Sequence, residues 1–87
     1  MPYIKVEERT QYFDLVNSLL SRLKKNDNNP GHINYIISKL VNEIFKSNKC
    51  YAEANKLMGV LSCVQAELYR RGIGEYENIK LKENKDI

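Results

Sequence analysis

The sequence predicts an all-α protein: a three-helix bundle with an extended N-terminal arm and a short polar C-terminal tail. Three observations support this fold class. Apolar residues recur at intervals of three and four along most of the chain. A cluster of turn-forming residues at 26–31 interrupts this pattern once, decisively. The chain has 87 residues, of which 43% are hydrophobic and 29% charged, as expected for one small globular domain spanning 1–87.

Residues 1–6 are expected to form the arm, because Pro2 disfavours helix at the residue before it and Tyr3 and Ile4 favour extended backbone. The first helix is predicted over about 7–25. Its apolar face consists of Tyr12, Leu15, Val16, Leu19, Leu20 and Leu23. Acidic residues near its start and basic residues near its end complement the helix dipole.

The second helix is predicted over about 32–46, directly after the 26–31 breaker. Its wide apolar stripe consists of Ile33, Ile36, Ile37, Leu40, Val41, Ile44 and Phe45. The many β-branched residues would also suit a strand. The three–four periodicity over this length favours a helix.

The third helix is predicted over about 51–71, with Gly72 ending it. One stripe is apolar: Leu57, Met58, Leu61, Val64 and Leu68. A second stripe is small or compact: Asn55, Gly59, Ser62, Cys63 and Ala66. A helix that is weakly polar all round is usually buried on more than one side. We therefore expect it to lie centrally in the bundle or to join identical subunits of a homo-oligomer. The tail, 73–87, is expected to be polar, with at most one short docked turn.

Composition limits the classes of partner. The net charge of +3 is mild and no basic run exceeds two residues, so nucleic-acid binding is not expected. No apolar stretch is long enough to span a membrane, and no signal peptide is evident, so we expect a cytoplasmic protein, in the host cytoplasm if it is viral. Cys50 and Cys63 are expected to be reduced thiols, with a disulfide as the alternative.

The sequence does not predict an enzyme. The only histidine, His32, follows a Pro-Gly turn and has no nucleophile at a recognisable spacing. A glycine-rich phosphate loop, a paired carboxylate motif and a metal-ligand spacing are all missing from the sequence. We therefore predict no catalytic residue, no metal and no cofactor.

The cluster Tyr69-Arg70-Arg71 is the main candidate for ligand binding. Two guanidinium groups beside a phenol ring can hold a phosphate and stack on a base. The alternatives are that the arginines complement the helix dipole, or that Glu67 pairs with one of them. If the arm returns to this end of the third helix, Tyr3 and Lys5 would join the cluster.

Polar residues beside the apolar stripes are further candidates. Asn34 and Asn55 lie next to apolar positions, where an asparagine is unfavourable unless its amide finds partners. Each amide is either buried and satisfied by another helix, or lines a ligand pocket. Tyr35 and Tyr51, at helix starts, have the same two interpretations.

Several motifs together resemble a known domain family: Pro2-Tyr3-Ile4-Lys5 with Glu8-Arg9, Gly31-His32-Ile33-Asn34-Tyr35, Tyr51 with Asn55, Gly59-Val60-Leu61, Glu67-Leu68-Tyr69-Arg70-Arg71, and Tyr76-Glu77 with Lys80 and Glu83-Asn84. The chain resembles, over nearly its whole length, a small helical family of phages and bacteria that has no settled function. Members often end in Glu-Asn-Gly-Asp, whereas this chain has Glu83-Asn84-Lys85-Asp86. The resemblance implies an oligomeric cytosolic protein of phage type.

Two functional hypotheses follow. The first is a non-enzymatic phage-type protein that sequesters a small phosphorylated or nucleotide signal of host defence between subunits, by analogy with helical phage proteins of other families. Its candidate ligand-binding residues are Tyr3, Lys5, Arg9, Asn34, Tyr35, Asn55, Tyr69, Arg70 and Arg71. The alternative is a protein-interaction module that inhibits or tethers a host protein. That alternative predicts an exposed apolar or tyrosine-rich patch and no small-molecule pocket.

Overall fold

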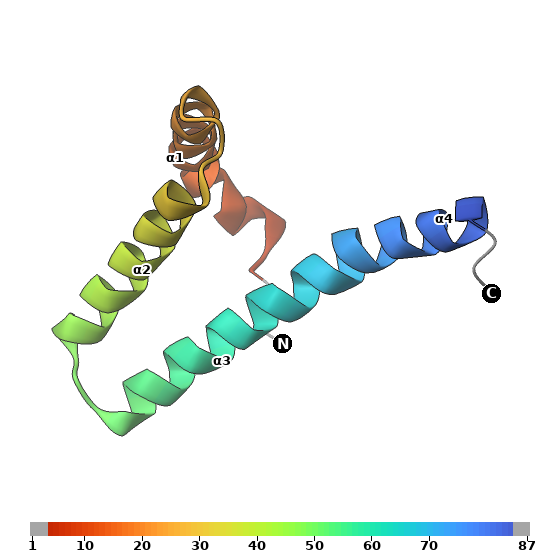
Figure 1. Cartoon of the computed structure of the whole chain (residues 1–87). Helices are drawn as coiled ribbons and strands as arrows, with labels where there is room; N and C mark the ends of the chain where they lie inside the picture. The colour runs from red at the N-terminus through yellow and green to blue at the C-terminus, as the bar shows by residue number, and fades with distance from the viewer. Residues whose placement is uncertain (1–3, 85–87) are drawn as a thin grey trace. The chain divides into compact units, whose positions relative to one another are not determined.

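The computed structural model describes residues 4–84, and these are almost entirely helical (Figure 1). The elements are α1 (Val6–Lys25), α2 (Pro30–Ser47), α3 (Tyr51–Leu68), a π-helical turn η1 (Tyr69–Ile73) and α4 (Gly74–Asn84). The all-α class and the three predicted helices are confirmed. The chain divides into two units, Met1–Ser47 and Asn48–Ile87, which are described separately below.

The first unit begins with a short piece of the arm and α1. The backbone of Lys5 is extended, and α1 starts at the next residue without a side-chain cap. Arg9 fastens the arm to the helix, because its Nε and Nη2 both donate to the carbonyl oxygen of Ile4, at 3.2 and 3.1 Å. Glu7 and Glu8 lie in the first turn and three basic residues in the last, as the dipole argument predicts.

The turn between α1 and α2 explains why α2 begins two residues before the predicted start at His32. Asn29 caps the helix: its Oδ1 accepts a hydrogen bond from the backbone N–H of Gly31 at 2.8 Å. Pro30 occupies the first helical position, where its missing N–H costs nothing. Asp27 and Asn28 both have positive φ, of 57° and 51°, and this left-handed backbone turns the chain between the two helices.

The helical interpretation of the second apolar stripe is confirmed, but the stripe is not buried. Four of its side chains are exposed, namely Ile33, Ile37, Leu40 and Ile44. The side chains beside them, Ile36, Val41 and Phe45, are half-buried. Since α1 and α2 make little contact with each other, the first unit does not close a core of its own.

The second unit corrects the prediction that the third helix ends at Gly72 and is followed by a polar tail. The backbone stays helical through Asn84. Neither Gly72 nor Gly74 adopts the left-handed conformation that ends a helix, and the φ of Gly74 is −61°. Instead, η1 inserts one extra residue, and the N–H of Gly74 donates to the carbonyl of Tyr69, five residues earlier.

Local side-chain pairs support α4, despite its polar composition. The Lys80 ammonium lies 5.6 Å from the centre of the Tyr76 ring and 3.2 Å from a carboxylate oxygen of Glu83. Pairs at these spacings each add a few tenths of a kcal/mol to a helix (roughly 0.2–0.5 kcal/mol). Tyr76 and Ile79, which were predicted to form at most one short docked turn, therefore lie within the longer helix α4.

The predicted core of α3 is also largely open. Leu57, at 9% exposure, is the one buried hydrophobic residue among residues 4–84. Met58, Val64 and Leu68 from the same stripe are exposed, and Leu61 is intermediate. Among residues 4–84, α3 is therefore not buried on two sides.

Candidate functional site

The predicted cluster of Tyr69, Arg70 and Arg71 lies in η1, where Glu67 holds both arginines. Arg70 Nη2 donates to both carboxylate oxygens of Glu67, at 2.9 and 3.1 Å. Arg71 Nε lies 2.7 Å from Oε2 of the same carboxylate. The spacing of three and four residues puts all three side chains on one face of the helix. The local pairing that the sequence suggested for one arginine therefore exists for both.

This pairing bears directly on phosphate binding. A carboxylate and a phosphate compete for the same charge and the same planar donors of a guanidinium group. Glu67 is largely buried beneath the two arginines, with 23% of its side chain exposed, whereas theirs are 63% and 68% exposed. An anion at Arg70 and Arg71 would have to displace this carboxylate or share the arginines with it.

Tyr69 has a structural role in the same turn. Its ring atom Cε1 lies 3.5 Å from the position that a Cβ on Gly74 would occupy, and its carbonyl oxygen lies 3.0 Å from that position. The backbone and ring of Tyr69 therefore limit the space for a side chain at position 74. About half of its surface remains exposed, so one part of the ring is accessible for stacking.

The arm residues do not add to the cluster in any way that the structure shows. Tyr3 lies outside the described residues. Lys5 and Arg9 belong to the first unit, while the Tyr69–Arg71 cluster belongs to the second. Within its own unit, Arg9 binds the Ile4 carbonyl, which is a structural role.

Asn34 and Tyr35 come together at the start of α2, and Asn55 lies apart on α3. The Oδ1 of Asn34 accepts a hydrogen bond from Ser38 Oγ at 3.0 Å. Asn34 and Tyr35 both line a shallow depression with Gly31 and Lys39. All three candidate residues are exposed, so the prediction of buried amides is wrong. The depression is formed by α2 alone and has no second wall that would enclose a ligand.

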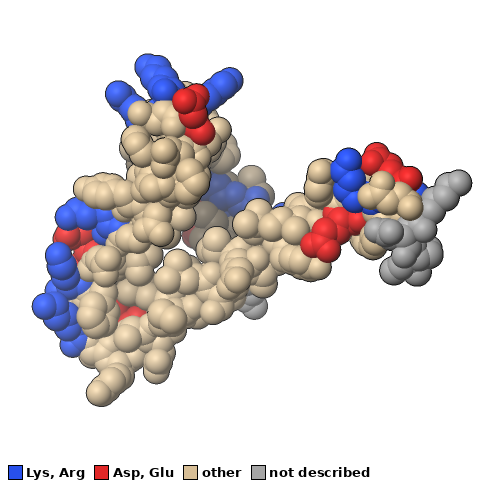
Figure 2. Space-filling view, viewed as in Figure 1, with Lys and Arg blue, Asp and Glu red and all other residues tan. Residues whose placement is uncertain are grey.

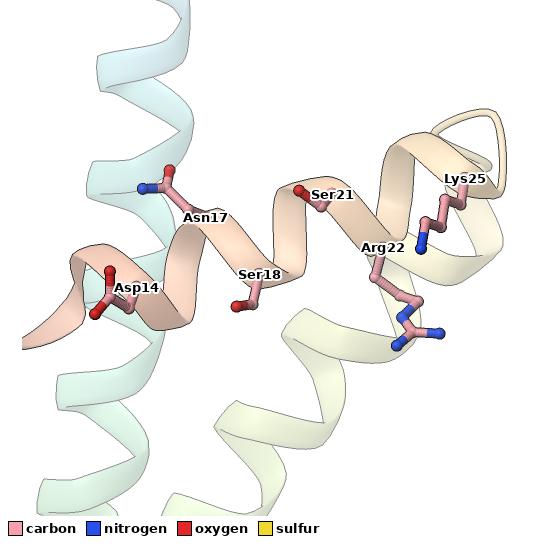
Figure 3. Close-up of a pocket in the computed structure, with 6 residues that line it drawn as sticks. All are labelled: Asp14, Asn17, Ser18, Ser21, Arg22 and Lys25. Atoms are coloured by element: carbon pink, nitrogen blue, oxygen red, sulfur yellow. The ribbon is translucent and has the colours of Figure 1, made fainter.

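Another depression in the described residues was missed by sequence reasoning. It is lined only by side chains of α1, which project from successive turns of one polar helix face (Figure 3). They are Asp14, Asn17, Ser18, Ser21, Arg22 and Lys25. Their spacing of three and four residues is the signal that would have identified this face. A single helix face contacts a ligand from one side only, so it does not form a binding pocket.

The chain matches, from residue 1 to residue 87, a family described as a domain of unknown function, DUF6899. It belongs to this family. The match covers the whole chain, as the resemblance implied, and the family description assigns no activity. No curated protein and no solved structure matches the chain.

Other kinds of site find no support in the described part of this DUF6899 chain. No group of three or more His, Cys, Asp or Glu side chains in residues 4–84 is arranged to hold a metal ion. Cys50 is exposed and Cys63 is half-buried, and both are unpaired thiols. None of the described helices combines the length and the apolar character needed to cross a bilayer.

The main surface feature of the DUF6899 chain is exposed apolar side chains on its helices. On α1 these include Tyr12, Phe13, Leu15, Val16, Leu19 and Leu20, and on α2 they include Ile33, Ile37, Leu40 and Ile44. The charged side chains gather in groups, and broad areas between them carry no charge (Figure 2). In soluble proteins, large exposed apolar patches are often sites of protein association.

Proposed function

We propose that this DUF6899 domain is a non-enzymatic protein-interaction module that binds through the apolar faces of its amphipathic helices. The observation that carries the proposal is that most side chains of the apolar stripes of α1 and α2 are exposed. The protein-interaction hypothesis from the sequence makes two predictions: an exposed apolar or tyrosine-rich patch, and no small-molecule pocket. The described residues are consistent with both of these predictions.

The energetics indicate how large the interface must be. Fully burying a Leu, Ile, Val or Phe side chain is worth roughly 1.5–3 kcal/mol, so burying the exposed half contributes about 1 kcal/mol. Association costs roughly 4–15 kcal/mol in lost freedom. An interface therefore needs on the order of ten such side chains. The exposed apolar side chains of α1 and α2 together reach this number, whereas Ile33, Ile37, Leu40 and Ile44 of one chain alone do not.

Sequestration of a small phosphorylated or nucleotide ligand between subunits is the weaker proposal. Its best candidates, Arg70 and Arg71, are both bound to Glu67, and the depressions in the described residues are open. The phage origin rests on the sequence resemblance, and the role against host defence rests on the analogy with helical phage proteins of other families. A protein that binds a host protein through its apolar faces would be equally compatible with that resemblance.

Affinity purification of the tagged full chain after mild cross-linking tests the proposal. Three forms are compared: wild type, Ile37→Lys in the exposed stripe, and Asn42→Lys on the polar side of the same helix. We expect a stoichiometric protein partner, either another copy or a different protein, with wild type and Asn42→Lys. Ile37→Lys should lose it.

Calorimetry of wild type against cyclic and linear nucleotides completes the test. If wild type carries no stoichiometric protein and binds a nucleotide with micromolar affinity, the interaction proposal is wrong and the ligand proposal replaces it. If both experiments are negative, the interaction proposal is also wrong.

A further inference from the structure

The four exposed apolar residues of α2 are spaced like the seam of a coiled coil. Ile33, Ile37, Leu40 and Ile44 are separated by four, three and four positions, and we call them the α2 stripe. This is the alternation of a and d positions over two heptads. Ile37 and Ile44 take the a positions, and Ile33 and Leu40 take the d positions. Isoleucine at a with leucine at d is typical of two-stranded parallel coiled coils.

The charges of α2 lie away from the α2 stripe and are paired within the helix. Lys39 Nζ lies 2.9 Å from Glu43 Oε1, and Lys46 Nζ lies 3.5 Å from the same oxygen. At 100° per residue, these three positions fall on a different side of the helix from the stripe. A second copy that approaches the stripe would therefore meet no charge of like sign. The stripe is complementary to itself.

We propose that the occupant of this surface is a second copy of the same chain, which packs its own α2 stripe against this one. This inference rests on the proposed function and identifies the binding partner as a second copy of the chain. The contact is isologous, the same residues facing each other across a two-fold axis, as in most homodimers. Exposed apolar side chains on α1, including Val16 and Leu19, are further apolar surface of the same unit. A different protein as occupant, and self-association through α3, are the competing outcomes.

Two lysine variants matched in exposure separate these outcomes. Leu40 in the α2 stripe and Val64 on α3 are both 57% exposed, so the single chain tolerates a lysine at either place equally well. The full-length wild type, Leu40→Lys and Val64→Lys are compared by sedimentation velocity over a range of concentrations. We expect wild type and Val64→Lys to sediment at twice the chain mass of 10.2 kDa. Leu40→Lys should raise the dimer dissociation constant by on the order of 100-fold, because each copy would bury an unpaired charge.

Two results would overturn the inference. The first is a wild type that sediments as a single chain at every concentration tested, up to millimolar. The second is dissociation by Val64→Lys with Leu40→Lys intact, which would assign the interface to α3, as the sequence suggested. The first result leaves the interaction proposal standing, because the affinity purification tests for other partners independently.

Circular dichroism of each variant shows whether a lost dimer is accompanied by a loss of helix. If Leu40→Lys loses both the dimer and its helix signal while Val64→Lys keeps both, helix formation depends on the α2 contact, which supports the inference. The milder Leu40→Ala then gives a folded reference with an intermediate loss of affinity, of about tenfold. A folded Leu40→Ala with unchanged affinity would contradict the inference.

Discussion

The π turn between α3 and α4 makes a prediction that distinguishes two glycines only two residues apart. A Cβ added to Gly74 would lie 3.0 Å from the carbonyl oxygen of Tyr69, the acceptor of the hydrogen bond that closes η1. A Cβ added to Gly72 would meet only the Cδ1 of Leu68, at an ordinary contact distance of 4.0 Å. We therefore predict that Gly72→Ala and Gly74→Ala change helix stability in opposite directions.

The magnitudes follow from these distances. Replacing a helical glycine with alanine stabilises a helix by roughly 0.5–1 kcal/mol when the site can accept the methyl group. Gly72→Ala should gain this amount in full. At Gly74 the same gain is opposed by a crowding cost of roughly 1–3 kcal/mol, because a backbone carbonyl in a hydrogen bond moves little. Gly74→Ala should therefore destabilise η1 by about 1 kcal/mol, and the two variants should differ by about 2 kcal/mol.

Amide hydrogen exchange of the full chain measures this difference locally. The N–H of residue 74 donates to Tyr69, so its protection reports the opening of η1. Protection should rise by several-fold in Gly72→Ala and fall by several-fold in Gly74→Ala. Equal stabilisation by both substitutions would show that the 3.0 Å approach does not exist in solution, and the argument for η1 would be wrong.

Three further predictions concern single side chains. Asn29→Ala removes the acceptor for the N–H of Gly31 and should cost about 1 kcal/mol of α2 stability in urea denaturation followed by circular dichroism, whereas a null effect would exclude the cap. The pKa of Glu43 lies below its usual value of 4.5, because Lys39 donates to the carboxylate and Lys46 adds a positive charge. Its contribution to stability should be present above pH 4.5 and be lost as the pH falls through the lowered folded value. NMR titration should detect this lowered pKa, and Lys39→Gln should move it back towards 4.5. Glu67→Gln should strengthen inorganic phosphate binding at least tenfold in calorimetry, since Arg70 and Arg71 lose a competing carboxylate, and unchanged binding would contradict this competition.

The helices were predictable because their signals are local. Apolar periodicity and the strong breaker at 26–31 gave the start and end of α1 within one residue and the end of α2 within one residue. The start of α2 was missed by two residues, since Asn29 caps the helix with Pro30 in its first position. The end of α3 was missed because Gly72 is equally compatible with a left-handed helix end and with a right-handed π turn.

The site was predictable only in part. The pairing of Glu67 with an arginine follows from a spacing of three or four residues, and the structure confirms it for both arginines. The exposure of Asn34 and Asn55 could not be derived, because an apolar neighbour in sequence does not establish which side chains another element covers. The same limit applies to Met58 and Val64, which periodicity assigned to the core and the structure leaves exposed.

Hydrogen exchange of the wild-type chain at two concentrations tests the central claim most directly, because it observes α2 itself without any substitution. If a second copy covers the α2 stripe, the amides of residues 33–44 should be protected at high concentration and should exchange faster after dilution below the dissociation constant. Protection in α2 that is the same at every concentration, together with a single-chain mass throughout, would contradict the claim.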